Sequence, residues 1–334
     1  MNVAVVGASG FTGLELVKII HAHPQFTLHT LATTQGDITL EALHPALKDV
    51  ISMDVDKVDL KTIASECELV FLAVPHKTAM DLVKVLMDFD IKIVDLSADY
   101  RLDLETYEKE YCPHTDKENI PASVYGLPEL YAKEIQNTKL VANPGCYPTS
   151  AVLALAPFSK LLKKDAPIFI DAKSGVSGAG KKCVDSTHFV TINENMFAYA
   201  SLEHRHGAEI QEKLGLLNER NNEVHFVPHL VPITRGMLAS VYIQLEEEVD
   251  AQALAKEYYK DAPFVRLRED EVQMKQVAGT NFCDLFVKQV GTTVFISSAI
   301  DNLLRGASSQ AVVNANLMCG FEEDLGIPTI AYAP

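Results

Sequence analysis

The residue whose type and position most clearly suggest chemistry is Cys146, which follows the sequence Asn143-Pro144-Gly145. These three residue types favour a turn, and Pro148 suits the first turn of a helix, so Cys146 is expected at or just before a helix N-terminus. The positive end of the helix dipole favours thiolate over thiol. Cys146 is therefore the candidate nucleophile, whereas the other five cysteines are expected to be structural, most of them in the core.

A thiolate nucleophile needs a partner that moves protons. Among the eleven histidines, His204 and His206 stand out because the sequence His204-Arg205-His206 opens a predicted helix. Glu209 follows His206 by three residues and so shares its helix face, where a carboxylate can fix the tautomer of an imidazole. Both histidines are candidates for the acid/base role, and the sequence does not separate them.

A glycine-rich loop, Gly7-Ala8-Ser9-Gly10-Phe11-Thr12-Gly13, joins a β-branched run to a helical pattern near the start of the chain. Glycines let the backbone approach a pyrophosphate, and a helix N-terminus offers N–H groups. The spacing G-x-x-G-x-x-G differs from the fingerprint G-x-G-x-x-G, so a purely structural turn is the alternative. The β-α-β context favours a dinucleotide site formed by Gly7, Ser9, Gly10, Phe11, Thr12 and Gly13.

The end of the second predicted strand bears on the choice between NAD and NADP. An NAD site usually has an acidic residue there, which binds the ribose 2′-hydroxyl. This chain has Ala32-Thr33-Thr34-Gln35 instead. The hydroxyls of Thr33 and Thr34 permit a 2′-phosphate, so we expect NADP. No arginine stands there to bind the phosphate, and Asp37 could still fold back toward the ribose.

Two further segments could bind anions. Residues 171–182 form a Ser/Gly-rich stretch that ends in lysines, and such loops expose N–H groups and hydroxyls, here around Ser174 and Gly175. Arg235 stands beside Gly236 just before a predicted strand and could bind a carboxylate or phosphate through two N–H groups. The alternatives are a flexible surface loop for the first segment and a surface salt bridge for the second.

The elements that must position these residues follow from hydrophobic patterning. In the first 100 residues, helical patterns at 12–23 and 77–89 alternate with short β-branched runs, which predicts a parallel sheet with helices on both faces. The predicted strands of this part are 3–6, 27–32, 69–74 and 92–96.

After about residue 145 the pattern changes. A helix over 148–163 precedes longer alternating runs, which suit a half-covered, partly antiparallel sheet, and a last helix is expected over about 306–319. The predicted strands here are 168–171, 223–228, 236–245 and 293–300. The predicted fold class is α/β: a Rossmann-like parallel-sheet dinucleotide-binding domain plus an α+β catalytic domain with a largely antiparallel sheet.

Length and charge exclude several classes of protein. A chain of 334 residues suggests two domains at roughly 100–200 residues each. The net charge of −16 argues against nucleic acid as a partner, and no apolar run reaches the roughly 20 residues of a membrane span. No secretory signal opens the chain, and no two of the six cysteines form a Cys-x-x-Cys pair. We expect reduced thiols, no metal site and a cytoplasmic protein.

Taken together, these motifs resemble the N-acetyl-γ-glutamyl-phosphate reductases of arginine biosynthesis, in their longer bacterial form. The resemblance runs nearly end to end. It is carried by residues 7–16, 73–76, 94–102, 124–129, 143–149, 174–180, 204–206, 209–210, 280–284, 301–303 and 306–307. There are two departures: Gly207-Ala208 stands where the family usually has Thr-Pro, and Ser309 stands where the last helix normally has a glycine.

The resemblance implies a fold similar to that of glyceraldehyde-phosphate and aspartate-semialdehyde dehydrogenases. Residues 1–145 and 303–334 would hold NADP, and residues 146–302 would form the catalytic and oligomerisation domain of a dimer or tetramer. The Cys146 thiolate would attack the acyl phosphate, and NADPH would reduce the resulting thioester with the help of a protonated histidine. The resemblance adds Pro75, Ser177, Gly178 and Asn302 to the cofactor-binding residues. It gives Ser174, Gly175, Arg235 and Arg101 as substrate-binding residues.

Three alternatives share part of this pattern. An aspartate-semialdehyde dehydrogenase handles a free amino group, so its site should hold an additional carboxylate. A reductase of a carrier-protein-linked amino-acid phosphate should present a basic rim to its acidic carrier, which the net charge of −16 disfavours. A non-catalytic dinucleotide-sensing protein would need the glycine loop but neither Cys146 nor the His204-Arg205-His206 motif.

Overall fold

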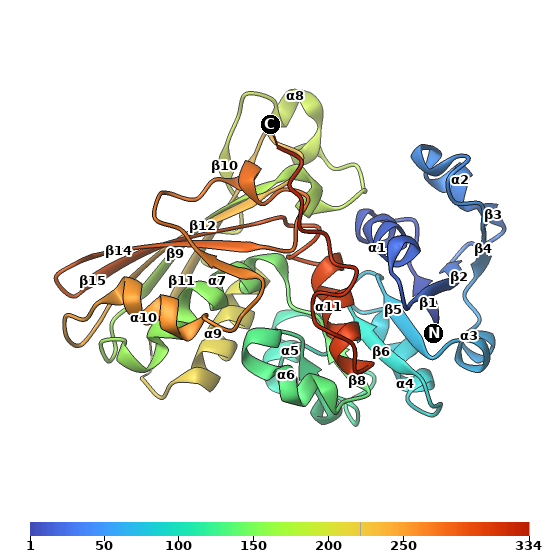
Figure 1. The fold of residues 1–334 in the computed structure, drawn as a ribbon, viewed down its shortest axis with the longest axis horizontal. Coiled ribbons are helices and arrows are strands. Elements are labelled where there is room, and N and C mark those ends of the chain that lie inside the picture. The colour runs from blue at the N-terminus through green and yellow to red at the C-terminus, as the bar shows by residue number, and fades with distance from the viewer. Residues whose placement is uncertain (221, 334) are drawn as a thin grey trace. The chain divides into compact units, whose positions relative to one another are not determined.

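Two sheets, each belonging to a separate unit of the chain, organise the structure (Figure 1). The structure is a computed structural model and describes residues 1–220 and 222–333. The first unit comprises residues 1–144 and 307–328, and the second comprises residues 145–306 and the chain from Thr329 onward. The sequence analysis assigned the whole segment 303–334 to the first domain, whereas here residues 303–306 and the chain from Thr329 belong to the second unit.

The sheet of the first unit has the strand order β3-β4-β2-β1-β5-β6-β8-β7. Of the strand pairs described, only β3 with β4 is antiparallel. The strands are β1 (Asn2–Val6), β2 (Thr27–Thr33), β3 (Ile38–Thr39), β4 (Asp54–Lys57), β5 (Leu69–Leu72), β6 (Lys92–Asp95), β7 (Ser123–Tyr125) and β8 (Leu140–Ala142). This arrangement confirms the predicted parallel-sheet fold of the N-terminal part.

Helices cover both faces of the central part of this sheet, where β1 and β5 are almost completely buried apolar runs without a polar face. On one face, Ala4 and Val70 of the sheet belong to the same apolar cluster as Ile63 of α3 and Met80 of α4, while α11 contacts both α1 and α6. The helices are α1 (Phe11–Ala22), α2 (Leu40–Leu43), α3 (Leu60–Glu66), α4 (Ala79–Leu86), α5 (Leu104–Glu110), α6 (Pro128–Gln136) and α11 (Ser308–Met318). All residues of α11 are buried, although it is far along the chain from the other helices of this unit.

The sheet of the second unit has the strand order β10-β11-β9-β12-β15-β14-β13 and is mostly antiparallel, with β9–β11 and β13–β14 as the parallel pairs described. Buried and more exposed residues alternate along β12, so one face is covered. Helices α7, α9 and α10 contact the sheet strands. The strands are β9 (Ile168–Gly175), β10 (Phe197–Ala198), β11 (Val224–Val231), β12 (Met237–Gln244), β13 (Val265–Leu267), β14 (Cys283–Val290) and β15 (Thr293–Ile300); the helices are α7 (Cys146–Leu155), α8 (Phe189–Ile192), α9 (Arg205–Leu217) and α10 (Ala251–Tyr258).

The helix predicted over 148–163 begins two residues earlier and ends eight residues earlier than expected. Helix α7 begins at Cys146 and ends at Leu155, where a 3₁₀ segment, Ala156–Leu161, takes over. Pro157 has no N–H group and cannot continue the α-helical hydrogen bonds, which accounts for the early end. Pro148 is tolerated as the third helical residue, because N–H groups of the first turn have no partner within the helix. Cys146 is thus the first residue of the helix, at its N-terminus as expected.

Candidate active site

Cys146 is the first residue of α7, and Gly145 occupies the N-cap position without a side-chain cap. The Gly145 N–H donates to Glu209 Oε1 at 3.0 Å, and Thr149 Oγ1 donates to the Gly145 carbonyl at 2.9 Å. A Cβ atom on Gly306 would lie 2.6 Å from the Cys146 Cβ, so only glycine fits at that position. The half-buried Cys146 therefore lies at the positive end of a helix. The backbone before it is held by hydrogen bonds of Gly145, and the Gly306 backbone packs against its Cβ atom.

His204 is the N-cap of α9, and its Nδ1 accepts the His206 N–H at 3.1 Å. Burial lowers the pKa of His204 to about 4, with the charge of Arg205 acting in the same direction and Glu209 opposing it. At neutral pH the His204 ring is uncharged and carries its hydrogen on Nε2. These contacts favour a structural role for His204 and leave His206 as the better candidate for the acid/base, a choice that the sequence leaves open.

Helix α9 approaches the start of α7 at two points. Glu209 contacts the turn before Cys146, and the rings of His204 and His206 each lie 5.8 Å from the ring of Tyr147, the residue after Cys146. The predicted role of Glu209 was to fix an imidazole tautomer. Its carboxylate accepts the N–H of Gly145, so Glu209 positions the loop that carries Cys146, and its contact with an imidazole stays a prediction.

Two tyrosines that the sequence analysis did not single out complete this region. The hydroxyls of Tyr147 and Tyr199 are 3.2 Å apart, and Tyr147 also donates to the His229 carbonyl at 3.3 Å. Burial raises the pKa of both hydroxyls, that of Tyr199 to about 12, and the nearby charge of Cys146 adds to the rise. Both hydroxyls therefore stay protonated and can donate hydrogen bonds. The only sequence signal for Tyr147 is its position beside Cys146.

The other cysteines differ from expectation in their exposure. Cys67 and Cys283 are buried, as expected for core residues, whereas Cys183 is exposed and Cys112 and Cys319 are partly exposed. Cys183 lies shortly after the Ser/Gly-rich stretch, where the alternative of a surface loop already indicated exposure. Within the described part of the chain none of the six cysteines forms a disulfide.

The Ser/Gly-rich segment is less open to anions than the sequence suggests. The N–H groups of residues 175, 176 and 177 donate to the carbonyls of residues 236, 233 and 234 at 2.9, 2.8 and 3.2 Å. These three donors pair with the segment that carries Arg235, so they do not point at a ligand. Anion binding in this region would fall on side chains and on the exposed Gly178.

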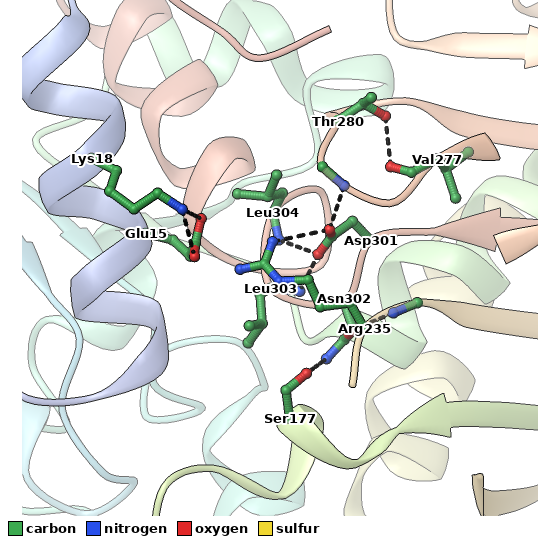
Figure 2. Close-up of polar contacts among 12 residues, drawn as sticks. Glu15, Lys18, Ser177, Arg235, Val277, Thr280, Asp301, Asn302, Leu303 and Leu304 are labelled. Carbon is green, nitrogen blue, oxygen red and sulfur yellow. Dashed lines mark hydrogen bonds and ion pairs between the residues drawn. The ribbon is translucent and has the colours of Figure 1, made fainter. Parts of the chain in front are cut away.

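Arg235 has a buried charge partner (Figure 2). Its Nη1 lies 3.2 Å from Asp301 Oδ2, and the same oxygen accepts the Gly279 N–H at 2.7 Å. Asp301 is fully buried, and its Oδ1 accepts the N–H groups of Leu303 and Leu304 at 2.9 and 3.1 Å. The salt bridge that Arg235 forms is therefore not a surface salt bridge, because its partner, the Asp301 carboxylate, is fully buried. Asp301 orients the guanidinium, as two-point recognition of an anion requires.

Asn302 brings several of the predicted cofactor and substrate residues together. Its Oδ1 accepts the Gly236 N–H at 2.8 Å, and its Nδ2 donates to Ser177 Oγ at 2.9 Å (Figure 2). A Cβ atom on Gly178 would lie 2.9 Å from Ser174 Oγ. Ser174, Ser177, Gly178 and Asn302 thus form one polar cluster of the second unit, and their ligands stay a prediction.

The glycine loop of the first unit has two positions that only glycine can occupy. Gly7 has a φ of +96°, and a Cβ atom there would collide with the Ala73 carbonyl. A Cβ atom on Gly13 would likewise collide with the Gly7 carbonyl. Gly10 is the N-cap of α1 without a side-chain cap, and the nearest atoms to a Cβ there are 3.9 Å away. The start of α1 therefore offers N–H groups to an anion, and these residues fit a dinucleotide.

The other predicted cofactor residues of this unit lie at the carboxyl edge of the sheet. Thr33 ends β2 and Pro75 follows β5, and these two strands flank β1. Such an edge is where ligands bind in open α/β sheets. Thr33 Oγ1 accepts the Gly36 N–H at 3.0 Å, and the chain then turns through Asp37 toward β4.

Arg101 lies in the first unit and is almost completely buried. Its Nε donates to the Asn143 carbonyl at 2.7 Å, and its Nη2 donates to the Leu96 carbonyl at 2.8 Å. Arg101 therefore anchors the chain three residues before Cys146. Its predicted contact with substrate stays a prediction.

Asp99, which the sequence analysis did not select, fixes the loop after β5. Its Oδ1 accepts the Lys77 N–H and the Tyr107 hydroxyl, both at 2.8 Å, and its Oδ2 accepts the Met80 N–H at 3.3 Å. Lys77 has a φ of +72°, which is unfavourable for a residue with a side chain. The carboxylate therefore stabilises an unusual backbone conformation two residues beyond Pro75.

Residues 1–220 and 222–333 also bear on two other kinds of site, metal centres and membrane spans. No group of three or more His, Cys, Asp or Glu side chains there is arranged to hold a metal ion. None of the helices in these residues combines the length and apolar character needed to cross a membrane.

Comparison with known proteins defines the class. Residues 2–138 match the family described as semialdehyde dehydrogenase, NAD binding domain, and residues 146–302 match semialdehyde dehydrogenase, dimerisation domain. The solved aspartate semialdehyde dehydrogenase II of Vibrio cholerae, complexed with ASA, is 16% identical with a TM-score of 0.74, over 96% of this chain and 98% of that one. The Candida albicans enzyme with NADP is 13% identical with a TM-score of 0.72, over 95% and 98%. The chain has the fold of the semialdehyde dehydrogenases.

Relatives of higher identity define the family within this class. The N-acetyl-gamma-glutamyl-phosphate reductase of Sulfurimonas denitrificans is 60% identical over 334 residues, which are 100% of this chain and 99% of the relative. That of Wolinella succinogenes is 53% identical over 332 residues, 99% and 98% of the two chains. The chain belongs to the N-acetyl-gamma-glutamyl-phosphate reductase family, and the resemblance inferred from its motifs is confirmed.

Proposed function

We propose that this protein catalyses the NADPH-dependent reduction of N-acetyl-γ-glutamyl phosphate to N-acetylglutamate semialdehyde with release of phosphate, a step of arginine biosynthesis. The observation that carries the proposal is the 60% identity over the full chain to a reductase of that name. The position of Cys146 at the start of α7, beside α9, supports a thioester route. Bound NADPH supplies the hydride, and the side chains of this protein supply the rest.

The first half of the reaction is acyl transfer to Cys146. The Sγ thiolate forms a bond to the carbonyl carbon of the acyl phosphate, the bond from that carbon to the phosphate oxygen breaks, and phosphate leaves with the electron pair. The N-terminus of α7 stabilises the thiolate, and a protonated His206 serves as its counter-ion. The protonated hydroxyls of Tyr147 and Tyr199 are hydrogen-bonded to each other in the same region, and Tyr147 also donates to the His229 carbonyl.

The second half returns Cys146 to its starting state. Once a hydride has reached the thioester carbon, the tetrahedral oxyanion on Cys146 collapses to the aldehyde, the C–S bond breaks, and sulfur takes the electron pair. His206 donates a proton to the departing sulfur and then takes it back, which restores the pair of thiolate and protonated imidazole. His204 is unsuited to this task, because its Nδ1 accepts the His206 N–H and burial lowers its pKa to about 4.

Arg235 is the proposed binding group for the α-carboxylate or the phosphate of the substrate. Arg235→Lys keeps the charge, and with it part of the attraction to Asp301, but loses the planar pair of N–H donors. We expect kcat/KM for the acyl phosphate to fall roughly 10- to 100-fold, the equivalent of one charge-assisted hydrogen bond. Steady-state kinetics and a melting temperature check this. An unchanged kcat/KM with a lowered Tm would assign Arg235 to the fold alone.

We also propose that the protein is a homo-oligomer, at least a dimer, that forms through the open face of the second sheet. Neighbouring strands β11, β9, β12 and β15 carry one aromatic residue each at paired positions; this aromatic row is His225, Phe169, Tyr242 and Phe295. Phe169 and Tyr242 are 51% and 47% exposed, too much for core residues. A match of residues 146–302 to a dimerisation domain supports a second copy of the chain as the partner.

Placing a charge in the aromatic row should dissociate the oligomer. Tyr242→Asp buries a carboxylate against the partner, so the variant should be monomeric at concentrations at which the wild type is associated. Val85→Asp, which changes an exposed apolar residue of the first unit, is the matched control. Sedimentation equilibrium gives both masses. A monomeric wild type, or a Tyr242→Asp variant of unchanged mass, would disprove this interface.

The proposed activity is tested by turnover with three substrates: N-acetyl-γ-glutamyl phosphate, aspartyl phosphate and a carrier-protein-linked aminoacyl phosphate. We expect NADPH oxidation and stoichiometric phosphate release with the first alone. The solved aspartate-semialdehyde enzymes have 12–19% identity to this chain, which supports no more than a common fold. Preference for another acyl phosphate would refute the proposal.

We propose a cytoplasmic location, which the absence of disulfides among the described cysteines supports.

A further inference from the structure

The carboxyl edge of β2 offers hydroxyl groups to a 2′-phosphate but no positive charge of its own. Thr33 Oγ1 accepts the Gly36 N–H at 3.0 Å, which leaves the hydroxyl hydrogen for a further acceptor. Thr34 follows as an exposed residue. Hydroxyls alone do not compensate the charge of a phosphate, so selective binding of NADP requires a cation from a neighbouring segment.

Lys57 is the cation that the sheet places beside this edge. It is the last residue of β4 and pairs in parallel register with Thr33, and the N–H of the next residue, Val58, donates to the Thr33 carbonyl at 3.1 Å. Side chains at paired positions of neighbouring strands lie on the same face of a sheet, about 5 Å apart. The side chains of Lys57 and Thr33 therefore start from one face, at the edge where a dinucleotide binds.

The loop after β2 bends around the end of β4. Gly36 has a φ of +65°, and a Cβ atom there would collide with the backbone nitrogen of Lys57. Asp37 has a φ of +52°, and the chain then enters β3, which pairs antiparallel with β4. Lys57 thus pairs with Thr33 and lies against the backbone of Gly36, so it belongs to the same corner of the sheet as the two threonines.

The charge of Lys57 is available. The residue is exposed, and none of the ion pairs formed by the described residues includes it. The adjacent Asp56 has its side chain on the opposite face of the strand, because successive strand residues alternate. Asp37 is the nearest acid along the loop, and it follows the turn at Gly36 instead of ending β2.

We propose that Lys57, with the hydroxyls of Thr33 and Thr34, binds the 2′-phosphate of NADP and determines the preference for NADP over NAD. This inference rests on the proposed function only for the identity of the nucleotide. It assigns the selectivity to a residue of a different strand from the one that carries the acidic residue in NAD sites. Lys57 is thereby a specificity-determining residue, with no contact to the reacting atoms.

The test measures binding of NADP⁺ and NAD⁺ to the ligand-free protein by calorimetry. Lys57→Gln keeps much of the side-chain length and removes the charge, so its Kd for NADP⁺ should rise roughly 10- to 100-fold, the value of a lost charged contact. Its Kd for NAD⁺ should change by less than about 2-fold, since NAD⁺ has no 2′-phosphate to lose a contact. Lys57→Arg should keep NADP⁺ binding close to that of the wild type. Lys61→Gln, which removes an exposed lysine from nearby α3, is the matched control and should change neither constant.

Three results would overturn the assignment. They are an unchanged Kd for NADP⁺ in Lys57→Gln, an equal weakening of both nucleotides, and a wild type that binds both equally. Circular dichroism melting of each variant separates a damaged fold from a lost contact. Turnover of wild-type protein with N-acetyl-γ-glutamyl phosphate distinguishes the two proposals. If the wild type turns over this substrate but Lys57→Gln binds NADP⁺ as tightly as the wild type does, only the role of Lys57 is rejected. If the wild type does not turn over this substrate but Lys57→Gln loses NADP⁺ binding as expected, only the proposed function is rejected.

Discussion

Replacing Cys146 by serine should lower kcat by about 10⁴-fold or more, because a poorly ionised hydroxyl takes the place of the thiolate nucleophile. The fold should persist, since oxygen for sulfur changes little volume, and serine is well tolerated at the start of a helix. Steady-state kinetics and thermal unfolding measure the two effects. Cys283→Ser is the matched control: it alters a buried cysteine 3.4 Å from the Ser298 hydroxyl, outside the proposed site. Near-normal turnover of Cys146→Ser would remove the thioester from the mechanism.

Alkylation gives an independent measure of the same residue. Cys183 is exposed and would react as well, so the experiment uses a Cys183→Ser background. Iodoacetamide should then inactivate the protein with one label, on Cys146, and bound acyl phosphate should slow the reaction. The rate should rise with pH through a midpoint below about 8.5, the value of an ordinary cysteine. Inactivation that maps to Cys283 would contradict the assignment.

His206→Asn should lower kcat by roughly 10²- to 10⁴-fold, the usual contribution of a general acid or base. His204→Asn should change kcat far less, because asparagine keeps an N-cap acceptor for the His206 N–H. His204→Ala removes that acceptor and should cost about 1 kcal/mol of stability. Kinetics and denaturant unfolding of the three variants check this. A larger loss of kcat in His204→Asn than in His206→Asn would reverse the two roles.

The pKa of His204 adds a pH signature to these variants. Folding lowers this pKa from 6.5 to about 4, so between these values the unfolded chain binds more protons than the folded one. The contribution of His204 to stability is therefore complete above about pH 6.5 and is lost as the pH falls toward 4. His204→Asn should flatten the fall in stability over this window. A pH profile of unfolding identical to that of the wild type would show that folding does not lower the pKa of His204.

The position of Cys146 could be predicted from sequence because every signal for it is local. The Asn-Pro-Gly turn and Pro148 act within a few residues, and they require little from the rest of the fold. The end of this helix was predicted wrongly. The apolar pattern continues past Pro157 and favours a helix to residue 163, whereas α7 ends at Leu155 and a 3₁₀ segment follows.

The partners of the site residues could not be predicted, because they are brought together by tertiary structure. Arg235 and Asp301 are 66 residues apart and meet where β12 pairs with β15. The distinction between His204 and His206 depends on the burial of His204 and on its N-cap hydrogen bond with the His206 N–H. Neither can be predicted from residue type, which is the same at both positions. Lys57 comes beside Thr33 only through the pairing of β2 with β4, and the sequence of β2 itself contains no lysine or arginine that would indicate the site.

The central claim is a covalent thioester on Cys146, and trapping it is the most direct test. The protein is mixed with N-acetyl-γ-glutamyl phosphate in the absence of NADPH, and phosphate release is followed alongside the mass of the intact chain and of its peptides. The mechanism predicts a burst of one phosphate per active site and an acyl group on the Cys146 peptide, which NADPH then removes as the semialdehyde. Phosphate release only in the presence of NADPH, with no acyl group on Cys146, would contradict it.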